Sequence, residues 1–261
     1  MFSQEKYNKN TSIDIKLNEP LTSDSCSKII VELIKYILYQ KQQIPFAFDT
    51  LVQLGKGKPA DRNFSSTKTL QNSLNNLTHQ LSSQLHLAGC NVKEVVVIIG
   101  ATTISPKFCL KVELPSQILS SEKHIEYQHS YRKPLLTLMK SLIECSDFQQ
   151  AIATPLSVTN TFVLVKKSDS NPKSEFFLPK PQYYLPVQIS CFSIKLFYNE
   201  DDFNSDCTCS NIVKVYNDNQ LDKTSQTTIN IDNSNVTCME TNVPYIWYQS
   251  KEVVKGFKFF R

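Results

Sequence analysis

Apolar residues in the first ninety positions recur at helical spacing. Between Ser25 and Gln43 they lie mostly three or four residues apart, which predicts an amphipathic helix that Pro45 ends. Thr22 and the residues up to Ser25 supply side-chain oxygens for an N-cap. A second helix is predicted from leucines with the same spacing, and Gly89 is well placed to end it: Leu70, Leu74, Leu77, Leu81 and Leu85.

The pattern then changes to that of strands. Val95–Ile99 is a continuous β-branched run, typical of a strand buried on both faces. Phe108–Leu114 alternates apolar and polar residues, as a half-buried strand does, and Pro106 marks the turn between the two runs. Three later runs also have strand-like composition: Ser157–Val165, Val187–Phe197 and Tyr245–Gln249.

A third predicted helix begins near Pro134, since proline is tolerated in the first turn, and continues to about Cys145. It has two adjoining apolar stripes: Leu135, Leu138, Leu142 and Cys145 in one, and Leu136, Met139 and Ile143 in the other. Together they are wider than the stripe that a helix needs for packing on a core. The second stripe is therefore either covered by another element or exposed as a partner-binding surface.

Helices followed by strands predict an α+β fold, with an antiparallel sheet and helices packed on one face. Residues 1–11 are polar, and we expect a flexible N-terminus. Residues 199–242 are rich in Asn, Asp, Ser and Thr, and we expect a mobile polar segment. Because no repeat or proline-rich linker divides the chain, residues 12–261 are predicted to form a single domain.

Composition argues against several classes of protein. The 261 residues have a formal net charge of +4, and the lysines are scattered, so we expect no nucleic-acid partner. No apolar run approaches the roughly 20 residues of a membrane span. The polar first ten residues do not resemble a secretory signal, so we expect the eight cysteines to be free thiols in an intracellular protein.

Candidate catalytic and metal motifs are weak. Gly55–Pro59 lacks the four residues that a phosphate loop has between its glycines, and a basic loop is expected instead. Cys207 and Cys209 lack the second ligand pair of a structural zinc site. No cysteine has a local signature of nucleophilic catalysis with one of the four histidines. We therefore expect no enzyme, no metal and no cofactor.

Four separated blocks resemble the comet family, whose members bind the checkpoint protein Mad-two (Mad2). They are LIKYILYQKQQIP (Leu33–Pro45), VVVIIGATTISPK (Val95–Lys107), FFLPKPQYYLP (Phe176–Pro186) and YIWYQSKEVVKGFK (Tyr245–Lys258). Their order and spacing argue against coincidence. The resemblance implies the HORMA-like fold of Mad2, in which three helices pack on one face of an antiparallel sheet and a C-terminal "safety belt" segment follows.

The resemblance also implies a function in silencing the spindle assembly checkpoint. A comet adaptor binds the closed conformer of Mad2 as a heterodimer and presents it to the pachytene-checkpoint AAA+ ATPase, which converts Mad2 to the open form. The ATPase supplies the energy, so the adaptor needs no catalytic residues. The implied location is the nucleus and cytoplasm, with the spindle or kinetochores in mitosis.

The family's functional positions can be carried over residue by residue. The resemblance places Gln40 and Met139 at the Mad2 interface, and with the rest of the second stripe the predicted interface is Gln40, Leu136, Met139 and Ile143. Met139 stands where the family has an aromatic residue; methionine keeps the apolar bulk and loses the rigid ring. Pro179 and Lys180 match the pair that faces the ATPase. Trp247 is expected to be buried and to anchor the C-terminal segment.

Two other functions are consistent with the residues alone. One is a HORMA protein that clasps a linear peptide, as an added strand, under its C-terminal belt. The other is a cysteine-dependent hydrolase, which a thiol-reactive active-site probe would label.

Overall fold

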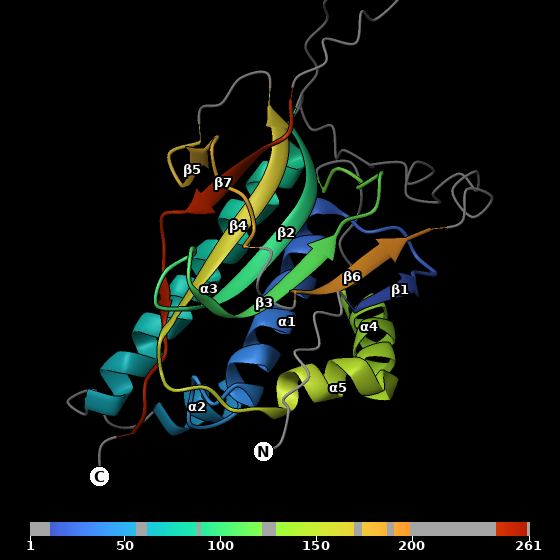
Figure 1. Ribbon diagram of the computed structural model, residues 1–261. Coiled ribbons are helices and arrows are strands. Elements are labelled where there is room, and N and C mark those ends of the chain that lie inside the picture. The colour runs from blue at the N-terminus through green and yellow to red at the C-terminus, as the bar shows by residue number, and fades with distance from the viewer. Residues whose placement is uncertain are drawn as a thin grey trace, which may run out of the picture.

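The computed structural model describes residues 11–55, 62–87, 90–121, 129–169, 174–186, 191–198 and 244–259 (Figure 1). Several predictions fall outside these ranges. They concern residues 1–10, the loop from residue 56 to Pro59, the end of the second helix at Gly89 and the polar segment at 199–242, which includes Cys207 and Cys209.

A mixed sheet runs through the centre of the molecule (Figure 1). Within the described ranges it has eight strands: β1 (Ser12–Lys16), β2 (Cys90–Gly100), β3 (Pro106–Glu113), β4 (Asn160–Asp169), β5 (Phe177–Lys180), β6 (Cys191–Phe197), β7 (Ile246–Ser250) and β8 (Val254–Lys255). The order is β1-β6-β3-β2-β4-β7-β5, and β8 pairs with β4.

The prediction of an antiparallel sheet was wrong for one strand. β6 runs parallel to both of its neighbours, β1 and β3, while the other pairings are antiparallel. Parallel neighbours need a long crossover and cannot be joined by a hairpin. Among the described residues, α4, α5, β4 and β5 separate β3 from β6 in the sequence, and so long a connection allows the two strands to run parallel.

The described residues form five helices where three were predicted: α1 (Ser23–Gln40), α2 (Phe48–Leu54), α3 (Arg62–His86), α4 (Arg132–Glu144) and α5 (Ser146–Ala153). The predicted helices are α1, α3 and α4. The other two have seven and eight residues, too few for a helical period to be seen in the sequence. Figure 1 shows α1 and α3 together behind the sheet, and α4 and α5 below the end that carries β6 and β1.

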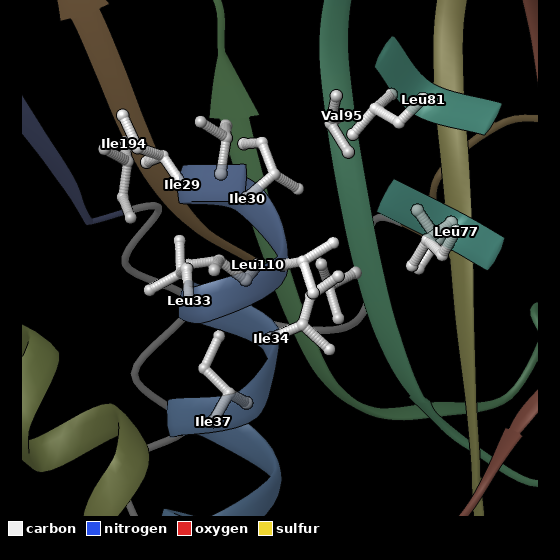
Figure 2. Packing of buried hydrophobic residues seen from close by; sticks show 14 of the residues in the cluster. Ile29, Ile30, Leu33, Ile34, Ile37, Leu77, Leu81, Val95, Leu110 and Ile194 are labelled. Carbon is white, nitrogen blue, oxygen red and sulfur yellow. The ribbon is translucent and has the colours of Figure 1, made fainter. Parts of the chain in front are cut away.

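β2 is buried on both faces, as its β-branched run predicts. Val95, Val97 and Ile99 face the helices, whereas Val96 and Ile98 belong to a second cluster on the opposite face of the sheet. Figure 2 shows the helix-side core, to which α1, α3 and the sheet contribute Ile29, Ile30, Leu33, Ile34, Ile37, Leu77, Leu81, Val95, Leu110 and Ile194. The second cluster contains Cys109, Phe162, Leu164 and Trp247, with Tyr183, Leu185, Cys191 and Val253 packed against it.

Local chemistry explains where α1 begins and ends. Thr22 caps the helix: its Oγ1 accepts a hydrogen bond from the Ser25 backbone N–H at 3.1 Å, and its own N–H donates to Ser25 Oγ at 2.8 Å. The helix ends at Gln40, three residues earlier than predicted. Gln42 has a φ of 55°, the left-handed conformation that commonly follows a helix end, so Gln43 lies outside the helix.

The C-terminal residues cross from the sheet to the helices. β7 lies between β4 and β5, and β8 pairs with the other end of β4. The chain then reaches the end of α1, where the Phe257 N–H donates to the Gln43 carbonyl at 2.8 Å. Trp247 is buried as predicted. No helix within the described ranges is long and apolar enough to cross a bilayer.

Candidate partner-binding surface

One face of α4 packs on the core and another carries the predicted stripe. In the first stripe Leu138 and Leu142 are buried, and Leu135 and Cys145 are partly buried. In the second stripe the side chain of Leu136 is 70% exposed and that of Ile143 is 59% exposed, whereas Met139 is partly exposed. Leu136 and Ile143 are seven residues apart, or about two turns, so both exposed side chains project from the same face of the helix. Within the described part of the chain, this face is left open to solvent.

Contacts to the next helix and to the sheet hold α4 in place. The Gln149 side chain on α5 donates from Nε2 to the Leu142 carbonyl, 2.9 Å away, at the end of α4. Phe148 is buried edge-to-face against Phe192 of β6, with 5.0 Å between ring centroids. The exposed stripe therefore stands on a fixed frame at the β1–β6 side of the sheet (Figure 1).

Charged residues surround the stripe. Lys133 Nζ lies 2.8 Å from a carboxylate oxygen of Glu19, and this hydrogen bond raises the pKa of Lys133. One turn apart on α4, Lys140 Nζ lies 3.9 Å from Glu144 Oε1. An apolar centre with a polar rim is the usual composition of a protein–protein interface.

Gln40 is the last residue of α1 and is half-buried. It lines a groove of about 560 Å³, together with a group of aromatic side chains: Tyr39, Phe46, Phe257 and Phe259. The ring of Phe259 meets Phe46 edge-to-face and stacks on Phe257, at centroid distances of 5.5 and 6.3 Å. The stripe on α4 is not part of this groove, so the structure places the predicted Mad2-facing residues in two separate areas.

Pro179 and Lys180 lie on β5, the strand at the sheet edge opposite β1. Proline is tolerated at an edge because it cannot donate to a sheet hydrogen-bond ladder. Pro179 is exposed beside the exposed Leu178, while Phe177 is buried and anchors the strand. Lys180 Nζ lies 3.5 Å from Thr103 Oγ1 and 5.7 Å from the centre of the Tyr183 ring. The predicted ATPase-facing pair is therefore on an extended edge, far along the sheet from α4 (Figure 1).

A family model described as "p31comet: Mad1 and Cdc20-bound-Mad2 binding" matches residues 3–201, well over half of the chain. This chain belongs to the p31comet family. A human relative, the MAD2L1-binding protein, is 25% identical over 191 residues, which cover 66% of this chain and 68% of the human protein. The resemblance found in the sequence is thereby confirmed. The fourth block, Tyr245–Lys258, lies beyond the matched range, so its assignment rests on the residues alone.

The sequence of this p31comet protein did not predict that two polar residues close to Gln40 would be buried. Lys41 is buried, and its ammonium donates to the carbonyls of Ala151 and Thr154 at 2.7 and 3.0 Å, which caps the end of α5. Burial lowers the pKa of Lys41. The Phe108 ring lies 4.7 Å from Nζ and offers its negative face to the charge. Lys41 thereby joins the end of α1 to α5, and so to the frame of α4.

Gln43 is the second of these residues and is fully buried. Its Nε2 donates to three carbonyl oxygens, those of Lys41 at 3.0 Å and of Leu156 and Ser157 at 3.3 Å. Its Oε1 accepts from the Thr159 N–H at 2.9 Å. The block KQQIP shows adjacent polar residues, and nothing in that pattern says which of them point inward.

Clusters suited to a metal ion are not found among the described residues: no three His, Cys, Asp or Glu side chains converge there. Five described cysteines are free thiols: Cys26, Cys90, Cys109, Cys145 and Cys191.

Proposed function

We propose that this chain binds the closed conformer of Mad2 and presents it to the pachytene-checkpoint AAA+ ATPase, thereby silencing the spindle assembly checkpoint. The observation on which this rests is the exposed apolar stripe of α4 in a chain of the p31comet family, whose description names Mad1- and Cdc20-bound Mad2. The human relative is likewise named for binding a Mad2 protein.

The stripe offers enough apolar area to be the centre of an interface. Fully burying one leucine or isoleucine side chain stabilises a complex by about 1.5–3 kcal/mol. Leu136 and Ile143 are more than half exposed in the free chain, so most of that gain is still available on binding. With Met139 between them, the stripe contributes several kcal/mol to the binding free energy. In many interfaces a few such residues account for most of the affinity. The fixed frame of α4 lowers the entropy lost on association.

Gln40 contributes polar recognition beside this centre. Its amide can donate and accept hydrogen bonds with the backbone of a partner. The aromatic groove next to it extends the contact area toward the C-terminal residues. In this proposal Mad2 spans both areas, α4 and the end of α1, which Lys41 holds in a fixed relation through α5.

The position of β5 supports an adaptor with two separate contact sites. Pro179 and Lys180 are on the sheet edge away from α4, so Mad2 on α4 leaves them accessible to the ATPase. We also propose that the fold is HORMA-like and that residues 244–259 are the counterpart of the safety belt. Their course along β4 and β5 to the end of α1 is consistent with that assignment. The proposed location is the nucleus and cytoplasm, with the spindle or kinetochores in mitosis.

Titration of the 261-residue chain with Mad2 trapped in the closed and in the open conformer tests the proposal. We expect a one-to-one complex with closed Mad2 and far weaker binding to the open form. A ligand that binds both conformers equally cannot shift the equilibrium between them, so equal affinities would contradict the proposed function.

Two aspartate variants locate the contact. Ile143→Asp places a charge where the interface is desolvated and should weaken binding about a hundredfold or more. Gln150→Asp introduces the same charge at an exposed position of α5, outside the stripe, and should bind as the unmodified chain does. A linear checkpoint peptide that binds while Mad2 does not would favour the peptide-clasping alternative.

A further inference from the structure

Two cysteines from neighbouring strands meet on the sheet face that is turned away from α1 and α3. Cys109 of β3 and Cys191 of β6 are direct partners in the parallel register of these strands. Their Sγ atoms are 2.7 Å apart, closer than two unbonded sulfur atoms normally come. We infer that Cys109 and Cys191 form a redox-active dithiol, a modification site whose co-substrate is a small-molecule disulfide.

The backbone geometry suits a disulfide. Neighbouring strands lie about 4.8 Å apart, which falls within the roughly 4.4–6.8 Å Cα separation that disulfides span. Because the two residues are paired in register, both side chains leave the same face of the sheet. Oxidation therefore needs little movement of the two strands.

The two thiols are not equivalent. Cys109 is buried, whereas Cys191 is partly exposed. A hydrogen bond from Cys109 and the positive charge of Lys111 lower the pKa of Cys191. The same hydrogen bond, together with burial, raises the pKa of Cys109. An accessible low-pKa thiol beside a buried high-pKa thiol is the arrangement of a nucleophilic and a resolving cysteine.

The chemistry balances with oxidised glutathione as the small-molecule disulfide. The Cys191 thiolate attacks one glutathione sulfur, the S–S bond breaks, and a glutathione thiolate leaves. Cys109 gives its proton to that thiolate, and its sulfur attacks Cys191 Sγ. The second glutathione leaves as a thiolate and takes up the proton that Cys191 had released. Two protein thiols are oxidised to one disulfide, and one oxidised glutathione is reduced to two molecules of the thiol.

Surrounding residues give the reaction a local context. The pair belongs to the second core cluster, where Tyr183 and Leu185 pack on the sheet. Tyr183 also donates a hydrogen bond from its hydroxyl to the Thr103 carbonyl at 3.0 Å. A disulfide at this point would fix β3 to β6 under the segment that follows β5.

Peptide mapping after exposure to oxidised glutathione, with all remaining thiols blocked, tests the inference on the full chain. We expect one disulfide, between Cys109 and Cys191, which dithiothreitol reverses. Cys26 is fully buried and burial raises its pKa to about 12, so it should stay a thiol and serve as an internal control. A wild-type chain in which Cys109 and Cys191 both remain thiols, or are joined to other cysteines, overturns the proposal.

Two variants separate the roles of the thiols. Cys109→Ser should trap a mixed disulfide of glutathione on Cys191, because the resolving thiol is gone. In Cys191→Ser, modification of Cys109 should be at least tenfold slower. The same rate at both cysteines contradicts the assigned roles. Thermal unfolding supplies a readout that does not depend on the variants: since the bridge joins residues 82 positions apart, the oxidised chain should melt roughly 5–10 °C higher.

Discussion

Replacing Gln43 by alanine should destabilise the fold more than any other single amide truncation near the end of α1. The change removes one side chain that makes four hydrogen bonds to backbone groups in two segments of the chain. The backbone carbonyl of Gln43 accepts a hydrogen bond from the Phe257 N–H, and the loss of the side-chain bonds should let this carbonyl move more freely. The affected groups lie in the connection from α5 to β4 and at the C-terminal segment.

The magnitude follows from what is left unpaired. A hydrogen bond contributes about 1 kcal/mol net, and a buried group without its partner costs about 1–3 kcal/mol. The Lys41 carbonyl keeps its bond from the Leu156 N–H at 3.1 Å, so it is not orphaned. The Thr159 N–H loses the acceptor Gln43 Oε1 and is the most costly group. We expect a loss of about 2–4 kcal/mol in the free energy of unfolding, and a melting temperature lower by roughly 5–10 °C.

Urea unfolding followed by circular dichroism measures this loss, and Gln40→Ala is the matched control. Gln40 is half-buried three residues away, so its truncation should cost no more than about 0.5 kcal/mol in stability while weakening Mad2 binding. Gln43→Ala should show the reverse: lower stability, with binding retained at temperatures where the chain stays folded. If Gln43→Ala unfolds within 0.5 kcal/mol of the unmodified chain, the reasoning from its hydrogen bonds is wrong.

Three further outcomes follow from α4 and β5. Leu138→Ala, in the core, should lower the free energy of unfolding by about 2–5 kcal/mol. Leu136→Ala, on the exposed stripe, should change it by less than about 0.5 kcal/mol. Similar losses for both variants in urea titrations would contradict the packing of one face of α4 on the core and the exposure of the other. Met139→Asp should weaken binding of closed Mad2 about a hundredfold with little change in melting temperature, and an unfolded variant would assign Met139 to the core instead. Pro179→Ala combined with Lys180→Ala should abolish ATPase-driven opening of Mad2 in a reconstituted assay while leaving Mad2 affinity intact; unchanged opening would mean that the contact lies elsewhere.

Periodicity in the sequence was enough to predict the elements with long, regular patterns. The leucine spacing of α3 predicted a helix with one buried face, and the β-branched run of β2 predicted a strand buried on both faces. The structure confirms both predictions. On α4, Leu138 and Leu142 are core residues as predicted, whereas the sequence left open whether the second stripe is covered, and the structure leaves Leu136 and Ile143 exposed. The proposed partner of the second stripe comes from the family resemblance. The sequence pattern of an exposed apolar stripe is the same whether or not a partner covers it.

The features that were missed are either short helices or contacts that depend on long-range pairing. α2 and α5 are too short to show a period, and the direction of β6 depends on the crossover that precedes it. Cys109 and Cys191 are 82 positions apart, and only the strand register brings them together. Lys41 shows the same limit, since lysine is rarely buried and its partners on α5 are more than a hundred residues away.

The proposed Mad2 contact at Gln40 is close in the sequence to two buried polar residues, Lys41 and Gln43. Lys41 connects the end of α1 to α5, and Gln43 connects it to the start of β4 and to the C-terminal residues. Each of these bonds requires both partners to hold their positions, because an unpaired buried amide or ammonium costs more than the bond itself contributes. Lys41 therefore fixes where the half-exposed amide of Gln40 lies relative to α5 and, through it, to the stripe on α4, whereas Gln43 contributes mainly to stability. In the proposed function, recognition of one Mad2 conformer would depend on the spacing that Lys41 sets between the two contact areas, and a buried polar group specifies such a spacing more narrowly than apolar packing would.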